Sequence, residues 1–128
     1  MKKKILILGS NSFSGNQLVS FLLKKNFLII GCSLSKQSEP KFNCFHKLPD
    51  KIIKNFKFEK IKINKDFEKL KRLILEHQPD IIIDFLGQGM VAESWQHPFL
   101  TFNTNELLII KLFNFLINKN FLKKYIKM

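Results

Sequence analysis

The residues best suited to chemistry follow the first apolar run of the chain, in the sequence ILILGSNSFSG at positions 5–15. Gly9 allows a sharp exit from a strand, because glycine adopts positive φ without steric cost. Gly15 would let the next helix approach that strand closely, and Ser12 between them is small enough to leave room for phosphate groups. Backbone N–H groups at the start of a helix favour anions. The pattern Gly-x-x-Ser-x-x-Gly therefore predicts a cradle for a pyrophosphate, and the alternative is a tight turn that binds nothing.

Other kinds of site find little support in the sequence. No Gly-Lys-Ser or Gly-Lys-Thr occurs, which excludes a P-loop for ATP or GTP. His46, His77 and His97 are too far apart for a local metal-ligand spacing, so we expect no metal site. Cys32 and Cys44 form no Cys-x-x-Cys pair, and we expect free thiols in a reducing, cytoplasmic compartment.

Composition limits the class of protein further. The 128 residues suit one domain, and 45% of them are hydrophobic, which argues against disorder. The net charge of +12 suggests nucleic-acid binding, but Arg72 is the single arginine and the lysines are spread along the chain, so we expect no nucleic-acid partner. The apolar run after Lys4 stops at Gly9, and no run reaches the roughly 18 residues of a membrane helix, so we expect no signal peptide and no membrane partner.

The elements that must position the turn alternate between strand and helix. Apolar runs predict strands at 4–8, 27–32 and 56–63, in the segment DIIIDFLG, and in the final KKYIKM. Helical spacing predicts a first helix that ends near Lys25 and further helices at 66–77 and 105–117. The segment 33–55 is expected to be a long loop with room for a short irregular turn. This alternation predicts an α/β fold, a doubly wound parallel sheet of Rossmann type with strand order 3-2-1-4-5, truncated after strand 5. A ligand would bind beyond the carboxyl ends of the strands.

Two motifs in this order make the sequence resemble the extended short-chain dehydrogenase/reductases, the NAD(P)-dependent nucleotide-sugar epimerases and dehydratases. ILILGSNSFSG resembles their glycine-rich turn, with Phe13 at the aromatic position. PDIIIDFLGQGMVAESWQHPFLTFNTN resembles their fourth strand and the loop that leads into a helix opening with Thr104 and Asn105. The segment 88–96 is similar to a branch of dTDP-glucose 4,6-dehydratase-like proteins.

The resemblance implies NAD or NADP as cofactor, a nucleotide-sugar substrate, hydride transfer at the sugar C4 by a lyase or isomerase, and a homodimer. Gln88 and Met90 are the implied substrate-binding residues. The implied cofactor-binding residues are Gly9, Asn11, Ser12, Phe13, Ser14, Gly15, Ser33, Ser35, Lys36, Leu86, Gly87, Gln88 and Asn105.

The sequence also departs from the pattern of that family. Ser12 replaces its middle glycine, and Lys62 stands where an Asp usually contacts the adenine. The second strand usually ends in an acid, but here Ser33 with Lys36 nearby would tolerate a 2′-phosphate, which keeps both NAD and NADP open.

The catalytic residues of the family have no counterpart in this chain. Tyr125 makes no Tyr-x-x-x-Lys pair and is simply a strand residue, so we expect no catalytic residue within 1–128. We expect these residues to be the N-terminal part of a cofactor-binding domain in a longer enzyme, without its sugar-binding domain. The alternative is a non-catalytic Rossmann module that senses NAD(P) or mediates protein interaction.

Overall fold

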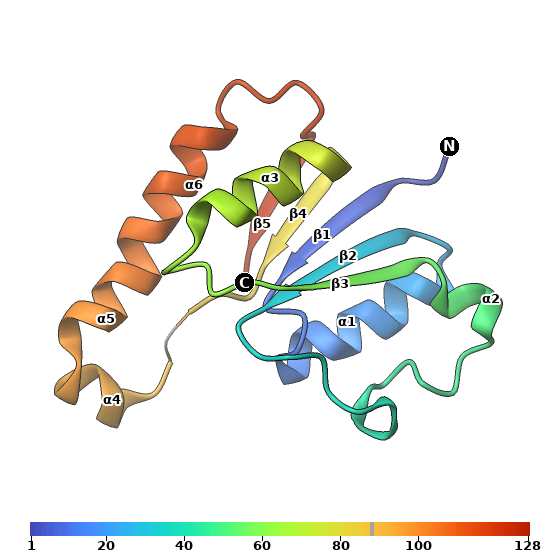
Figure 1. Cartoon of the computed structure of the whole chain (residues 1–128), viewed down its shortest axis with the longest axis horizontal. Helices are drawn as coiled ribbons and strands as arrows, with labels where there is room; N and C mark the ends of the chain where they lie inside the picture. Colours follow the sequence, from blue (N-terminus) through green and yellow to red (C-terminus); the bar gives the residue numbers. More distant parts are fainter. Residues whose placement is uncertain (88) are drawn as a thin grey trace. The chain divides into compact units, whose positions relative to one another are not determined.

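A parallel sheet organises the computed structural model, which describes residues 1–87 and 89–128. Its order is β3-β2-β1-β4-β5, and each neighbouring pair is parallel (Figure 1). The strands are β1 (Lys4–Leu8), β2 (Leu28–Ser33), β3 (Phe56–Lys60), β4 (Ile81–Asp84) and β5 (Lys124–Lys127). The predicted Rossmann-type sheet and its strand order are therefore confirmed.

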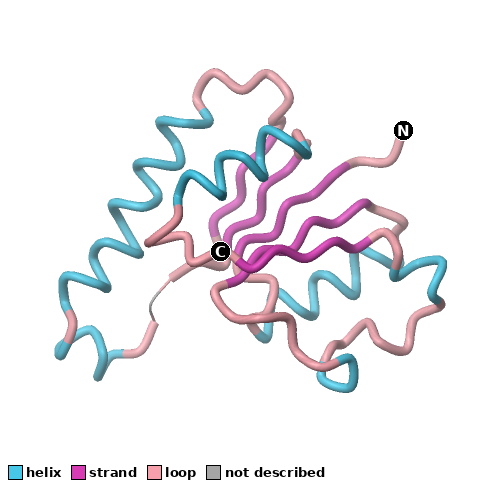
Figure 2. Tube along the Cα trace, in the orientation of Figure 1, coloured by secondary structure: helices cyan, strands magenta, loops and turns pink. Residues whose placement is uncertain are grey.

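The described chain forms two compact units. The first, Met1–Phe85 with Phe121–Met128, contains the sheet. Its helical elements are α1 (Phe13–Lys24), the 3₁₀ turn η1 (Pro40–Phe42), α2 (Asp50–Ile53) and α3 (Phe67–His77). The second unit, Leu86–Asn120, is helical (Figure 2). It holds α4 (Val91–Gln96), α5 (Pro98–Phe102), the π-helical turn η2 (Asn103–Leu107) and α6 (Leu108–Leu116).

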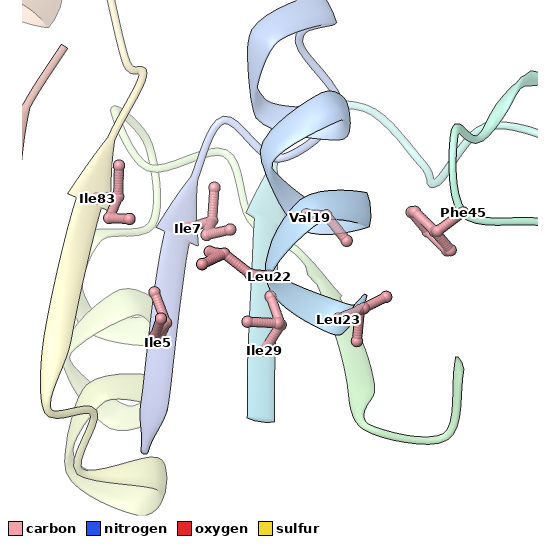
Figure 3. Packing of buried hydrophobic residues seen from close by; sticks show 8 residues of the cluster. All are labelled: Ile5, Ile7, Val19, Leu22, Leu23, Ile29, Phe45 and Ile83. Carbon is pink, nitrogen blue, oxygen red and sulfur yellow. The ribbon is translucent and has the colours of Figure 1, made fainter. Parts of the chain in front are cut away.

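One apolar layer lies between the sheet and α1. Alternate residues of a strand point to the same face, as Ile5 and Ile7 of β1 do. Ile5 lies in register with isoleucines of both β2 and β4, and Ile7 lies in register with Ile83 of β4. In Figure 3 the Leu22 side chain of α1 and the Ile7 side chain point toward one another. The buried cluster consists of Ile5, Ile7, Val19, Leu22, Leu23, Ile29, Phe45 and Ile83. This layer fixes where α1 begins, and so where its N-terminus meets the sheet edge.

The second face of the sheet carries α3, opposite α1 (Figure 1). Leu70 and Ile74 of α3 are fully buried, as are Leu6 of β1 and Ile82 of β4. Crossover connections between parallel strands are right-handed. The connection from β1 to β2 through α1 and the connection from β3 to β4 through α3 run in opposite directions across the sheet, which requires helices on both faces. The carboxyl ends of β1, β2 and β4 thus meet at one edge of the sheet.

Local sequence explains where α1 and α3 end. Asn26, with φ of 64°, follows α1, and Gln78, with φ of 46°, follows α3. Asparagine tolerates this left-handed conformation, which commonly closes a helix. At the start of α3, the Asp66 side chain accepts a hydrogen bond from the Lys69 N–H at 3.0 Å. Such a side-chain cap satisfies one of the four open donors of a helix N-terminus.

Two predictions about the connections were wrong. The segment 33–55, expected to be a long loop with at most a short irregular turn, contains the helix α2 in addition to the 3₁₀ turn η1. The stretch after β4 forms α4 and α5, and helical backbone continues from Pro98 through η2 into α6. Thr104 and Asn105 consequently lie inside this helical stretch and not at its start, because Pro98 at the first helical position begins it. Over the described ranges, no helix is long and apolar enough to cross a membrane.

Candidate functional site

The turn after β1 is held against the end of β2. The N–H groups of Gly9 and Ser10 both donate to the Cys32 carbonyl, at 2.7 and 3.2 Å, and Ser12 N–H donates to the Gly9 carbonyl at 3.0 Å. Gly9 has φ of 78°, and a Cβ there would lie 3.1 Å from Phe85 Cβ. The glycine is therefore required for its conformation and for its close approach to the end of β4.

Helix α1 begins directly on this turn. Ser12 is its N-cap, and the Ser12 hydroxyl accepts a hydrogen bond from Gly15 N–H at 3.0 Å. A Cβ on Gly15 would lie 2.4 Å from the Gly9 carbonyl oxygen. Since no side chain fits there, Gly15 is what allows the helix to start this close to the turn.

Two backbone donors stay open at this helix start. Asn16 N–H donates to Ser12 O at 2.8 Å, and Gly15 N–H is used by the cap. Among the residues that the structure describes, no acceptor is assigned to the N–H groups of Phe13 and Ser14, both of which are exposed. The first turn of α1 carries no acidic residue. Two adjacent N–H groups and the positive end of the helix dipole together suit a phosphate.

The polar residues predicted around the end of β2 also come together. The Ser33 hydroxyl is buried and accepts a hydrogen bond from Asn11 N–H at 2.9 Å. The Asn11 carboxamide donates to the Lys36 carbonyl at 2.8 Å, to the Ser35 hydroxyl at 3.2 Å and to the Ser35 carbonyl at 3.4 Å. The predicted set from Gly9 to Gly15 thus forms one continuous structure with Ser33, Ser35 and Lys36.

A second set of hydrogen bonds, which the sequence did not predict, holds the loop of residues 34–49 against α1. Asn16 on α1 donates to the Asn43 side-chain oxygen at 3.0 Å and accepts from Cys44 N–H at 2.7 Å, and both asparagines are buried. Ser20 donates to the Cys44 carbonyl at 3.3 Å. Asn43 lies in a polar stretch without periodicity, so no local signal identified it.

A buried charge, also missed, lies at the end of β4. Asp84 is fully buried, accepts a hydrogen bond from the Tyr125 hydroxyl, and lies 3.1 Å from Lys127 Nζ on β5. Burial, followed by the bond to Asp84, raises the pKa of Tyr125 well above its usual range. A carboxylate between Ile83 and Phe85 was a visible signal, because an acid in an apolar strand requires a partner. Tyr125 lies in β5, as predicted.

The remaining predicted residues belong to the unit Leu86–Asn120. A Cβ on Gly87 would lie 3.7 Å from the Asn105 side-chain oxygen, so these two predicted residues are close together. Met90 precedes α4 with its side chain 62% exposed, and Leu86 is half-buried. Gln88, predicted to bind both cofactor and substrate, lies outside the described residues.

Comparison with known proteins points to one family. The sequence model of a family described as GDP-mannose 4,6 dehydratase matches residues 6–128. CDP-glucose 4,6-dehydratase of Salmonella typhimurium is 26% identical over 110 residues, which are 86% of this chain and 29% of that relative. The chain therefore spans less than a third of the length of this curated relative.

Solved structures share the fold. A UDP-glucose 4-epimerase of Thermotoga maritima, solved with UDP-glucose, has a TM-score of 0.77 and 25% identity, over 97% of this chain and 37% of that one. A UDP-glucose 4-epimerase of Stenotrophomonas maltophila, solved with bound NAD, has a TM-score of 0.75 and 17% identity, over 98% of this chain and 36% of that one. This second likeness concerns the fold alone.

Proposed function

Because the chain belongs to the GDP-mannose 4,6 dehydratase family, we propose that it binds a nicotinamide dinucleotide, NAD or NADP, for a nucleotide-sugar dehydratase or epimerase. The observation that carries this proposal is the pair of open N–H donors of Phe13 and Ser14 at the start of α1. They lie on a turn that Gly9 and Gly15 hold at the carboxyl edge of the sheet, where doubly wound folds bind dinucleotides.

The residues of this chain bind and orient the cofactor. The Phe13 and Ser14 N–H groups would donate to the pyrophosphate. The Ser12 hydroxyl already accepts the hydrogen bond that caps the helix, and so it stabilises the turn. Ser33, Ser35 and Lys36 would lie at the adenosine ribose. Leu86, Gly87, Gln88 and Asn105 would contact the nicotinamide side, with Gln88 and Met90 toward the sugar. The bound cofactor supplies an acceptor for the hydride of the sugar C4.

We further propose that these 128 residues are the N-terminal, cofactor-binding part of a longer cytoplasmic enzyme. The share of its relatives that the chain spans, 29% of the dehydratase and 37% of the epimerase, supports this. A homodimer through α6 is part of the same proposal, since Ile110, Phe113 and Ile117 are exposed on that helical stretch. Exposed apolar groups of this kind favour association.

The test removes one open donor without disturbing the helix. Proline is tolerated at the first position of a helix, and Ser12 already has the extended backbone (φ −63°, ψ 159°) that precedes a proline. Phe13→Pro therefore deletes the Phe13 N–H, and Phe13→Ala is the matched control that loses the side chain and keeps the donor. Calorimetric titration with NAD and NADP measures the binding.

We expect Phe13→Pro to bind about 10- to 100-fold more weakly than Phe13→Ala, the equivalent of a charge-assisted hydrogen bond of about 1.5–3 kcal/mol. Both variants should keep the circular dichroism spectrum and melting temperature of the parent within a few degrees. Equal affinity of the two folded variants would show that the turn does not bind the pyrophosphate.

A further inference from the structure

We propose that this site selects dinucleotides that carry a 2′-phosphate, and that Asn11 is the positioning residue that holds Lys36 at that phosphate. The inference rests on the proposed function, since it concerns the ribose end of the same cofactor site. It commits to one of the two cofactors that the proposed function leaves open.

Strand β2 does not end in an acid. Sites for NAD place a carboxylate after the second strand to accept from the ribose 2′-hydroxyl. Here β2 ends in Ser33, whose hydroxyl oxygen already accepts from Asn11 N–H at 2.9 Å. Ser33 is also 5% exposed, which leaves it little surface to offer a ligand. The feature that would select the free 2′-hydroxyl is therefore missing.

The charges around the end of β2 favour a ligand with an additional phosphate. In the β2–β3 register Ser33 lies opposite Lys60 and Cys32 lies opposite Glu59, and Glu59 is paired with Lys69 at 3.4 Å. Lys36 is exposed, and in the described chain no carboxylate is paired with its ammonium group. The acid nearest to it in sequence, Glu39, pairs with Lys41 at 3.0 Å. Lys36 thus adds a positive charge that no described carboxylate pairs, which favours a ligand with an additional phosphate.

The loop that carries Lys36 is held in place by hydrogen bonds from Asn11. The Asn11 carboxamide donates to the Lys36 carbonyl at 2.8 Å and to both oxygens of Ser35. Asn11 itself belongs to the turn that would bind the pyrophosphate. One side chain therefore fixes where the Lys36 backbone lies relative to the turn, and a loop that is already held loses less conformational entropy on binding. Asn16 and Asn43 anchor the same loop further along, so its fold does not depend on Asn11 alone.

The experiment measures the ratio of the NAD and NADP dissociation constants for four proteins: the parent chain, Lys36→Gln, Asn11→Ala and the double variant. We expect the parent to prefer NADP by about tenfold or more, and Lys36→Gln to lose this preference through weaker NADP binding alone. Asn11→Ala should lose most of the preference, because it weakens NADP binding more than NAD binding. The double variant should resemble Lys36→Gln, since both changes remove the same interaction.

Three other outcomes would contradict, in turn, the role of Asn11, the preference for NADP and dinucleotide binding itself. If Asn11→Ala weakens NAD and NADP equally, Asn11 merely supports the turn and is not a positioning residue for the 2′-phosphate. Equal affinity of the parent for both cofactors overturns this inference and leaves dinucleotide binding intact. If the folded parent binds neither cofactor, the proposed function fails, and this inference fails with it.

Discussion

At the scale of single residues, the polar side chains around the turn are mostly bonded to one another, and Ser10 is the exception. Within the described residues, its hydroxyl is the one buried side-chain polar atom without a hydrogen-bond partner. It lies over β2, where a Cβ on Gly31 would be 2.7 Å from the hydroxyl and equally close to the Phe56 ring. An unsatisfied buried hydroxyl costs about 1–3 kcal/mol of desolvation free energy.

Replacing Ser10 should consequently not harm stability. We expect Ser10→Ala to leave the free energy of unfolding unchanged or to raise it by up to about 1 kcal/mol, because the desolvated hydroxyl is removed. The matched control is Ser20→Ala, since Ser20 is also buried but donates to the Cys44 carbonyl at 3.3 Å. That control should lose about 0.5–1.5 kcal/mol. Urea unfolding measures the free energy of unfolding of both variants. An equal loss in the two would mean that the Ser10 hydroxyl also makes a hydrogen bond.

At the scale of elements, the ends of the helices set the connections. Gln78 adopts φ of 46° and ψ of 64° after α3, and its N–H donates to the Ile74 carbonyl at 2.8 Å. This left-handed position favours glycine, since a residue with a Cβ is strained there. The connection from α3 to β4 therefore carries strain that a single substitution can relieve.

We expect Gln78→Gly to raise the free energy of unfolding by about 0.5–1 kcal/mol, despite the greater flexibility that glycine gives the unfolded chain. Gln17→Gly is the matched control, because it makes the same replacement at an exposed residue inside α1. It should lower stability by about 1 kcal/mol, the helix-propensity cost of glycine. Thermal and urea unfolding measure both, and a loss in both variants would indicate that position 78 is not left-handed in solution.

These elements also show what sequence alone could predict. The sequence identified all five strands and α1 and α3. Continuous aliphatic runs marked the strands that are buried on both faces, and alternation of apolar and charged residues marked β3 nearer the sheet edge. The short helices α4 and α5 were missed, since six and five residues give no readable period. The turn at Gly9–Gly15 was predicted as a unit, but the bonds from Asn11 to the 34–49 loop were not. Such contacts depend on register and side-chain geometry, which composition does not encode.

At the scale of the whole molecule, the sheet is tied at both ends of β4 by carboxylates in a strongly basic chain. Asp80 accepts from Lys4 N–H at 2.9 Å and from Lys123 Nζ at 2.8 Å, which joins the chain at the starts of β1, β4 and β5. Asp84 joins the other end of β4 to β5. The hydrogen bond from Lys123, and then that from the Lys4 backbone, holds the pKa of Asp80 below its ordinary value. The chain has 22 Lys and Arg against 10 Asp and Glu, so acid removes its few negative charges.

The sign of the resulting pH dependence follows from the lowered pKa of Asp80. Its contribution to stability is fully present above the pKa of an unfolded Asp, about 3.9, and is lost as the pH falls through the folded pKa.

We therefore expect Asp80→Asn to lower the free energy of unfolding by about 1 kcal/mol at pH 7, a small value because the carboxylate is partly exposed. At pH 3 the difference from the parent should shrink. Urea unfolding at both values measures it, with Asp50→Asn as the control for an exposed acid. Repeating the pH 3 series with 0.5 M salt should stabilise all three proteins, because screening reduces repulsion among the 22 Lys and Arg charges. A difference between Asp80→Asn and the parent that stays constant from pH 7 to pH 3 would show that the ionised carboxylate does not tie the strands together.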